Sequence, residues 1–136
     1  MKIIVCLDDR DGMLFHGRRQ SADRMLRRNM LDLARNSTLR MNRYSRNQFT
    51  EDIPQIEESD DFLAEAEEND YCFVEDRDIS PYASKVNTVI IYRWNRVYPS
   101  DMKFPTELFE GRWRLTARKE FAGSSHERIT EEIYML

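Results

Sequence analysis

The sequence predicts a single α/β domain with a mostly parallel central sheet that is closed by an antiparallel hairpin. Short β-branched runs alternate with helical segments over residues 1–94, which is typical of α/β proteins. The last third of the chain instead alternates with a period of two, as expected for paired strands. Because 136 residues provide one hydrophobic core, we expect a single domain over residues 1–136.

The parallel part of the sheet is expected from four short apolar runs, each bounded by polar or turn residues. These predicted strands cover 2–7, 37–42, 71–74 and 87–94. Helical segments between them are predicted at 21–34, 43–49, 59–69 and 79–86. The segments 8–20 and 50–59 contain glycines, a proline and many charges, and they are expected to be connections.

The first helix has the clearest pattern. Leu26, Met30 and Leu33 recur at spacings of four and three, so they share one face. Ser21 is a suitable N-cap, and Asp23 in the first turn is favoured by the helix dipole.

The C-terminal hairpin is expected from two runs, 112–121 and 127–136, that are joined by AGSSH. Trp113, Leu115, Ala117 and Phe121 are predicted to lie on one face.

Charge is unevenly distributed along the chain, although the net charge is only -4. Residues 1–49 carry 11 Lys/Arg against 5 Asp/Glu, whereas residues 50–80 carry 1 against 13. We interpret the two regions as complementing each other, within one molecule or across a homo-oligomer, in preference to binding nucleic acid through the N-terminal arginines.

No apolar run reaches the roughly 18 residues of a membrane span, and the N-terminal run is too short for a signal peptide. The sequence therefore predicts a cytoplasmic protein with no membrane association, in which Cys6 and Cys72 are reduced core residues. The two cysteines and two histidines form no metal-ligand spacing, so no metal is expected. His16 and His126 are interpreted as a solvated surface pair.

Four short motifs occur in the order in which they are found in dihydrofolate reductases. Asp8-Asp9 with Gly12 resembles the opening V-D-x-N-x-G, and Met41-Asn42-Arg43-Tyr44-Ser45 resembles M-G-R-x-T. Residues 79–94 resemble the helix and strand around I-Y and A-D-x-I-Y-L-T, and residues 101–105 with a later tryptophan resemble D-x-x-F-P…W. The resemblance implies a dihydrofolate reductase-like three-layer sandwich.

The departures from that family concern its cofactor site. Glu75 and Asp76 stand where the reductases have a glycine pair at the dinucleotide, and Asn42 stands where M-G-R-x-T has its glycine. The segment 49–59 is too short and acidic to hold the adenosine phosphate, and the loop 9–20 lacks the family's Pro-Trp. Set against the family pattern, these departures imply that no cofactor is bound. The alternative is NADPH, held at its phosphates by Arg43 and Ser45.

The leading hypothesis is a divergent dihydrofolate reductase-like protein that has lost NADPH binding and binds a small molecule or a protein partner. By the resemblance, Cys6, Asp23 and Tyr92 line its ligand cleft, with Tyr92 in place of the family's threonine and Asp23 as the only candidate catalytic residue, a proton relay. Two alternatives remain: a divergent NAD(P)H-dependent reductase of a pterin-like substrate, and a nucleic-acid or phosphate-binding protein that uses the N-terminal arginine face.

Overall fold

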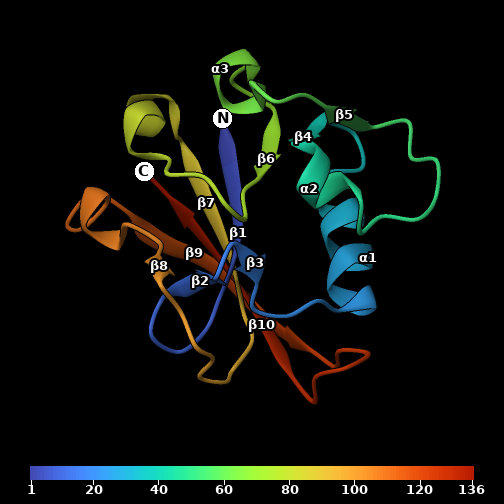
Figure 1. Ribbon diagram of the computed structural model, residues 1–136. Helices are drawn as coiled ribbons and strands as arrows, with labels where there is room; N and C mark the ends of the chain where they lie inside the picture. The colour runs from blue at the N-terminus through green and yellow to red at the C-terminus, as the bar shows by residue number, and fades with distance from the viewer.

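The computed structural model describes residues 1–136 and contains a seven-stranded mixed sheet with helices and a small second sheet around it (Figure 1). The strands of the main sheet, in chain order, are β1 (Lys2–Leu7), β4 (Leu39–Met41), β5 (Ile56–Glu58), β6 (Tyr71–Phe73), β7 (Thr88–Arg93), β9 (Arg114–Phe121) and β10 (Ile129–Met135). The second sheet contains β2 (Gly12–Phe15), β3 (Arg18–Arg19) and β8 (Met102–Lys103). The helices are α1 (Arg24–Leu33), α2 (Arg43–Arg46), α3 (Phe62–Glu65), η1 (Ser80–Lys85) and η2 (Thr106–Leu108).

The order of strands in the main sheet is β5-β4-β6-β1-β7-β10-β9. The first five are mutually parallel, with Ile4 of β1 lying between Phe73 of β6 and Ile90 of β7. Only the C-terminal hairpin runs antiparallel, through β10 on β7 and β9 on β10. The predicted α/β class with a parallel sheet and a closing hairpin is confirmed.

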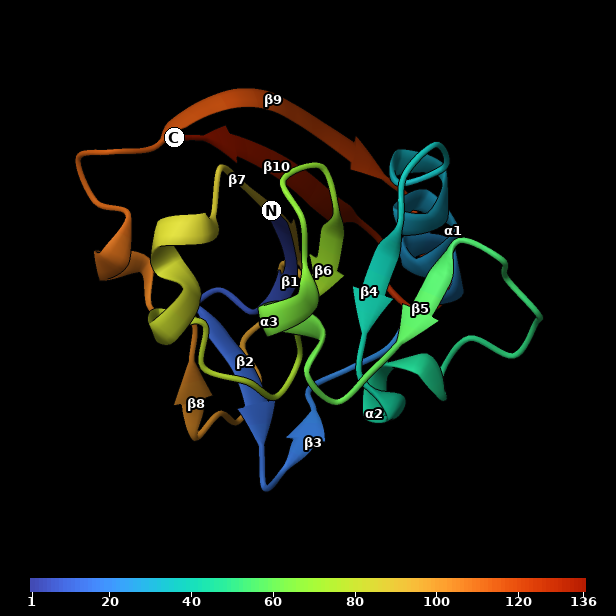
Figure 2. The same cartoon turned by 90° about the horizontal axis from the view of Figure 1, so that it is seen from above.

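Hydrophobic cores fill both faces of the sheet, because the buried parallel strands carry apolar residues on both sides. Ile4, Leu39 and Ile90 face the helix α1, whose Leu26 and Met30 are buried against them. On the opposite face, α3, η1 and the second sheet cover a separate core. Figure 2 shows α1 on one side of the sheet and the small sheet and η1 on the other, so the molecule has three layers.

The N-cap of α1 is Asp23, not Ser21 as predicted. The Asp23 carboxylate accepts hydrogen bonds from the backbone N–H groups of Met25 and Leu26, and its φ of -152° is extended. A carboxylate at this position satisfies the free N–H groups of the first turn. The Ser21 hydroxyl instead lies 3.1 Å from His126 Nε2.

The predicted connections contain strands that the sequence did not reveal. The segment 8–20 contains β2 and β3, and the segment 50–59 contains β5 at the edge of the main sheet. These three strands are only two to four residues long, so their periodicity is too short to detect.

The prediction that Leu115 and Ala117 of β9 lie on the same face of the sheet is wrong. A β-bulge places Ala117 opposite Ile133 but Leu115 opposite Tyr134, so Leu115 and Ala117 point to opposite faces. A bulge shifts the alternation by one residue, which the sequence pattern alone does not show. Seven of the eight residues of β9 are exposed, and the strand forms one edge of the sheet.

Some arginines of the basic region 1–49 form ion pairs with acids of the region 50–80 within one molecule, as the sequence predicts. Arg40 pairs with Asp70 at 2.6 Å and with Glu57 at 3.3 Å, and Arg43 approaches Glu58 at 3.9 Å. Cys6 and Cys72 are free thiols. None of the helices is long and apolar enough to cross a bilayer.

Candidate functional site

The carboxyl ends of β1 and β6 lie side by side in the sheet, and each is followed by a buried acid. Asp8 follows β1 and is fully buried. Its carboxylate accepts from the backbone N–H groups of Arg10, Gly12 and Tyr98. Burial alone would raise the pKa of Asp8, but these hydrogen bonds outweigh it and lower the pKa. Asp8 therefore holds the loop after β1 in place as a carboxylate.

Glu75 lies in the turn after β6, where the reductases have a glycine pair at the dinucleotide. Its carboxylate is 6 % exposed and forms a bidentate pair with Arg19 at 2.9 and 3.1 Å. Ser45 and Gln48 also donate to it, at 2.9 and 3.0 Å. The charge of Glu75 is thus neutralised by Arg19 of β3, and its carboxylate is further hydrogen-bonded by α2 and the segment after α2.

The guanidinium of Arg19 is fixed from a second side. It lies over the ring of Tyr44, 4.2 Å from the centroid, and donates to the Tyr44 carbonyl oxygen at 3.0 Å. The Tyr44 hydroxyl in turn accepts from the Arg19 backbone N–H. These contacts attach β3 of the small sheet to α2.

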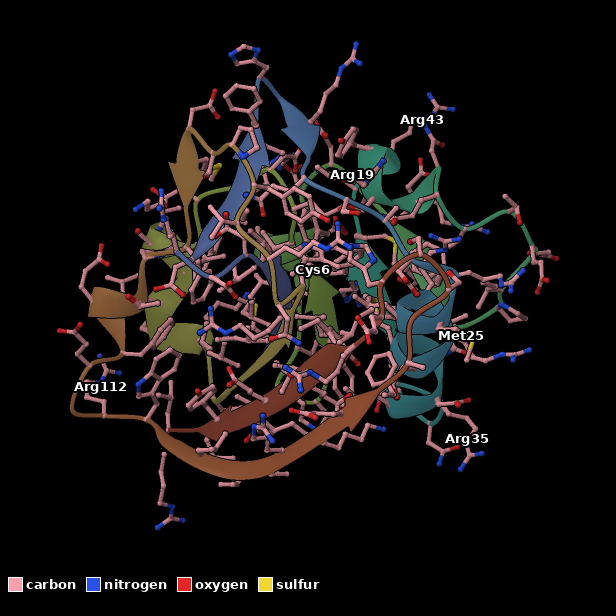
Figure 3. All side chains as sticks on the ribbon, turned by 90° about the horizontal axis from the view of Figure 1, so that it is seen from below. Cys6, Arg19, Met25, Arg35, Arg43 and Arg112 are labelled. Atoms are coloured by element: carbon pink, nitrogen blue, oxygen red, sulfur yellow. The ribbon has the colours of Figure 1, made fainter.

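The space between this network and β1 is a cavity of about 10 Å³. Cys6, Arg19 and Ser21 are among its lining residues, whereas Asp23 and Tyr92 are not. In Figure 3, Cys6 and Arg19 lie toward the middle of the molecule. Burial, and then the charge of Glu75, raise the pKa of the Cys6 thiol well above its usual value. A cavity of this size holds about one water molecule, so it is no cleft for an organic ligand.

Asp23 is surrounded by the loop between β9 and β10. In addition to capping α1, its carboxylate accepts from the backbone N–H groups of Ser124 and Ser125, at 3.0 and 2.9 Å. Burial would raise the pKa of Asp23, but these bonds, with those from His126 and Leu26, hold the pKa well below its usual range. The approach is close, since a Cβ at Gly123 would lie only 2.5 Å from Asp23 Oδ2.

His126 is buried, and the expectation of a solvated surface histidine is wrong for it. Its side chain is 3 % exposed, and its ring stacks on Trp94 with the centroids 4.5 Å apart. Nδ1 lies 3.1 Å from Asp23 Oδ2, and Nε2 lies 3.1 Å from Ser21 Oγ and 3.0 Å from the Tyr98 hydroxyl. The hairpin brings His126 to this place from over 100 residues away, which no local spacing could show. His16, in contrast, is exposed.

Tyr92 lies in β7 beneath α1, and its hydroxyl is engaged within the protein. It accepts from Asn29 of α1 at 2.7 Å and donates to Glu131 of β10 at 2.8 Å. Burial, and then the charge of Glu131, raise the pKa of Tyr92 well above its usual value. Cys6 and Tyr92 are adjacent in the sheet register, but the structure gives Cys6, Asp23 and Tyr92 no common cavity.

The two predicted phosphate ligands on α2 do not converge. Ser45 is buried and its hydroxyl donates to Glu75. The Arg43 side chain is 83 % exposed and extends away from the molecule (Figure 3). The backbone N–H of Ser45 is capped by Asn42 Oδ1 at 3.1 Å, while Asn42 donates to Asp76 at 2.9 Å.

A larger groove lies between α1 and the segment after α2, with a volume of about 310 Å³. Three arginines line it, and none of them forms an ion pair or a side-chain hydrogen bond within the protein: Arg24, Arg27 and Arg28. Leu31, Phe49 and Ile53 provide an apolar part, and Asp32 and Glu51 also line the groove. The apolar wall opposite the arginines depends on how the segment 48–53 folds back against α1.

No group of three or more His, Cys, Asp or Glu side chains is placed to hold a metal ion.

Comparison with solved structures identifies the architecture. A dihydrofolate reductase from Enterococcus faecalis, complexed with NADP(H) and RAB-propyl, superposes with a TM-score of 0.69. The chain has the dihydrofolate reductase-like fold. The match covers 98 % of this chain and 94 % of the reductase, at 11 % sequence identity, so one such fold accounts for nearly all residues and the likeness shows the fold alone. No protein-family model and no curated protein matches the sequence.

Proposed function

We propose that this protein is a divergent member of the dihydrofolate reductase-like fold that binds a small anionic ligand and does not use NADPH. The observation that carries the proposal is the groove beside α1, where three unpaired arginines face an apolar wall. A guanidinium binds carboxylate and phosphate through paired hydrogen bonds, and an apolar wall accommodates an aromatic or aliphatic body. The chemistry fits an amphipathic anion such as an aryl carboxylate or aryl phosphate.

The residues at the carboxyl end of β6 do not fit a dinucleotide, and this supports the second half of the proposal. A pyrophosphate requires free backbone N–H groups and positive charge. At this turn Glu75 and Asp76 contribute carboxylates, Arg19 is already committed to Glu75, and Asn42 caps α2. The adjoining cavity of about 10 Å³ leaves no room for a nicotinamide.

The test is calorimetric titration of the protein with phenyl phosphate at low salt. We expect binding that Arg27→Gln and Arg28→Gln each weaken about tenfold, which corresponds to about 1.4 kcal/mol. Arg35→Gln is the matched control, because Arg35 is an exposed arginine just after the same helix and does not line the groove (Figure 3). Absence of binding, or an equal loss in the control, would contradict the proposal.

The same protein tests the two alternatives. A divergent reductase predicts that millimolar NADPH raises the unfolding midpoint by several degrees, because a ligand at 100 times its Kd stabilises by about 2.7 kcal/mol. Arg43→Gln and Ser45→Ala should abolish that shift. A nucleic-acid partner instead predicts binding of an oligodeoxythymidylate with a steep dependence on salt. A protein partner or a homo-oligomer would be detected as a change in mass by sedimentation.

A further inference from the structure

Asp23, His126 and Ser21 form a continuous hydrogen-bonded chain that the proposed anion site does not use. His126 Nδ1 lies 3.1 Å from Asp23 Oδ2, and His126 Nε2 lies 3.1 Å from Ser21 Oγ. Because the hydrogen bonds to Asp23 keep its carboxylate ionised, the imidazole proton belongs on Nδ1. Nε2 then presents its lone pair to the two hydroxyl groups in contact with it, those of Ser21 and Tyr98.

Ser21, His126 and Asp23 thus stand in the order of a nucleophile, a base and a residue that orients the base. Such constellations occur on unrelated folds and are recognised by geometry and not by sequence position. Asp23 is held rigidly as the helix cap, and the His126 ring is held by its stacking on Trp94. The base therefore needs no rearrangement to accept a proton from Ser21.

The segment around Ser21 also offers donors for a developing negative charge. The backbone N–H groups of Ser21 and Ala22 lie outside all helices and strands, and neither has an acceptor within the protein. In acyl transfer the backbone N–H of the nucleophile and of the next residue are suitable oxyanion donors. Ser21 is half-buried and Ala22 is exposed, so an ester would reach Ser21 from the solvent side and not through the cavity of about 10 Å³ that Ser21 also lines.

We propose that Ser21 is the nucleophile of an esterase site, with His126 as general base and Asp23 as its positioning residue. Ser21 Oγ attacks the ester carbonyl carbon as its proton passes to His126 Nε2, and the carbonyl oxygen becomes an oxyanion. Collapse of this intermediate breaks the bond to the leaving alkoxide, which takes the proton from Nε2 and departs as an alcohol. A water molecule, deprotonated by Nε2, then attacks the acyl carbon; the bond to Ser21 Oγ breaks, Oγ takes the proton back from Nε2, and the carboxylic acid is released.

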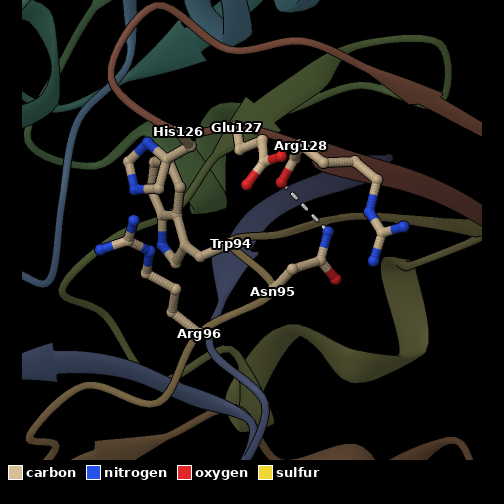
Figure 4. A pocket seen from close by; sticks show the side chains of 6 residues that line it. All are labelled: Trp94, Asn95, Arg96, His126, Glu127 and Arg128. Carbon is tan, nitrogen blue, oxygen red and sulfur yellow. Dashed lines mark hydrogen bonds between the residues drawn. The ribbon is translucent and has the colours of Figure 1, made fainter.

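The surroundings of His126 indicate the substrate class. A cavity of about 310 Å³ borders the imidazole and is lined by Trp94, Arg96 and Arg128, together with Asn95 and Glu127 (Figure 4). Arg96 forms no ion pair, and Arg128 only approaches Glu120 at 3.8 Å. Ser21 does not line this cavity, so the cavity would hold the anionic group of an ester while the ester carbonyl lies outside it, at Ser21.

The test is covalent labelling of the intact protein with diisopropyl fluorophosphate, which phosphorylates an activated serine and releases fluoride. We expect one adduct per chain, located at Ser21 by peptide mass mapping, and hydrolysis of 4-nitrophenyl acetate that is lost with it. Ser21→Ala should abolish both, and His126→Gln should slow labelling at least about 100-fold. Tyr98→Phe removes the competing hydroxyl and should retain the Ser21 adduct, while Ser100→Ala is a control serine outside the chain of hydrogen bonds.

Two results would overturn the proposal. The first is an unmodified Ser21 in the wild-type protein, which needs no variant to fold. The second is labelling at the same rate in His126→Gln while circular dichroism shows that this variant is folded. An adduct on Tyr98 in place of Ser21 would assign the nucleophile to the tyrosine and refute the role given to Ser21.

Discussion

Replacing Asp23 by asparagine should destabilise the protein strongly, because the two carboxylate oxygens serve different elements. Oδ1 accepts from the first turn of α1 and from Ser124, whereas Oδ2 accepts from Ser125 and His126. An amide retains the first oxygen and presents an NH₂ group to the second set of donors. Two buried donors lose their acceptor at about 1–3 kcal/mol each, so we expect a loss of about 2–6 kcal/mol.

The assay is equilibrium unfolding in urea near pH 7, followed by tryptophan fluorescence and circular dichroism. A loss of this size is a large part of the 5–15 kcal/mol that holds a typical domain folded. Asp32→Asn is the matched control, since Asp32 is an exposed acid of the same helix and should change stability by less than about 0.5 kcal/mol. If Asp23→Asn cost no more than this control, the network around Oδ2 would not exist as described.

The same pair of proteins has a defined pH dependence. The folded-state pKa of Asp23 lies below its unfolded value of about 3.9, so its carboxylate stabilises the fold above that pH. This contribution is lost as the pH falls through the folded-state pKa. The part of the difference in unfolding free energy between wild type and Asp23→Asn that comes from the Asp23 charge should therefore shrink below about pH 4.

Three further changes test the other networks by the same unfolding assay. Glu75→Gln should cost about 2 kcal/mol, because it removes the charge opposite a partly buried guanidinium, and a cost below about 0.5 kcal/mol would refute that role. Tyr92→Phe should cost about 1–2 kcal/mol, because it removes a hydroxyl that is hydrogen-bonded to Asn29 and Glu131. Tyr82→Phe is the control and should be neutral, because the Tyr82 hydroxyl has no partner within the protein. Equal effects of the two changes would argue against the buried hydroxyl network. Leu39→Ala should cost about 2–5 kcal/mol and Leu115→Ala, at 46 % exposure, almost nothing, and the reverse order would invalidate the burial of β4.

The order of the main elements could be predicted from the sequence because each is encoded locally. The apolar runs of β1, β6 and β7 are long enough to recognise, and Leu26 and Met30 mark the inner face of α1. The short strands β3 and β5 carry no such signal, since their pairing depends on partners distant in the chain.

The site could be predicted only in part, for the same reason. Glu75 was found because it stands where a glycine is expected, but its neutralisation by Arg19 connects residues 56 positions apart. His126 was misplaced because its burial depends on Trp94 and Asp23, which the hairpin loop meets only in the folded protein. The role of a single polar residue depends on its tertiary contacts, and sequence periodicity does not predict which residues make those contacts.

The edge strand β9 has a consequence for how the molecules behave at high concentration. An exposed eight-residue strand is a ready template for a strand of another chain. Here the bulge near Thr116 interrupts the straight row of main-chain groups, and Arg114, Arg118 and Lys119 place positive charge along it. Some antiparallel registers of two identical β9 strands, such as those that place Arg118 opposite Arg118 or Lys119, would bring these positive charges face to face. The edge is thereby protected from sheet extension, and replacing Arg118 and Lys119 by threonine should convert it into a nucleus for fibrillar aggregation.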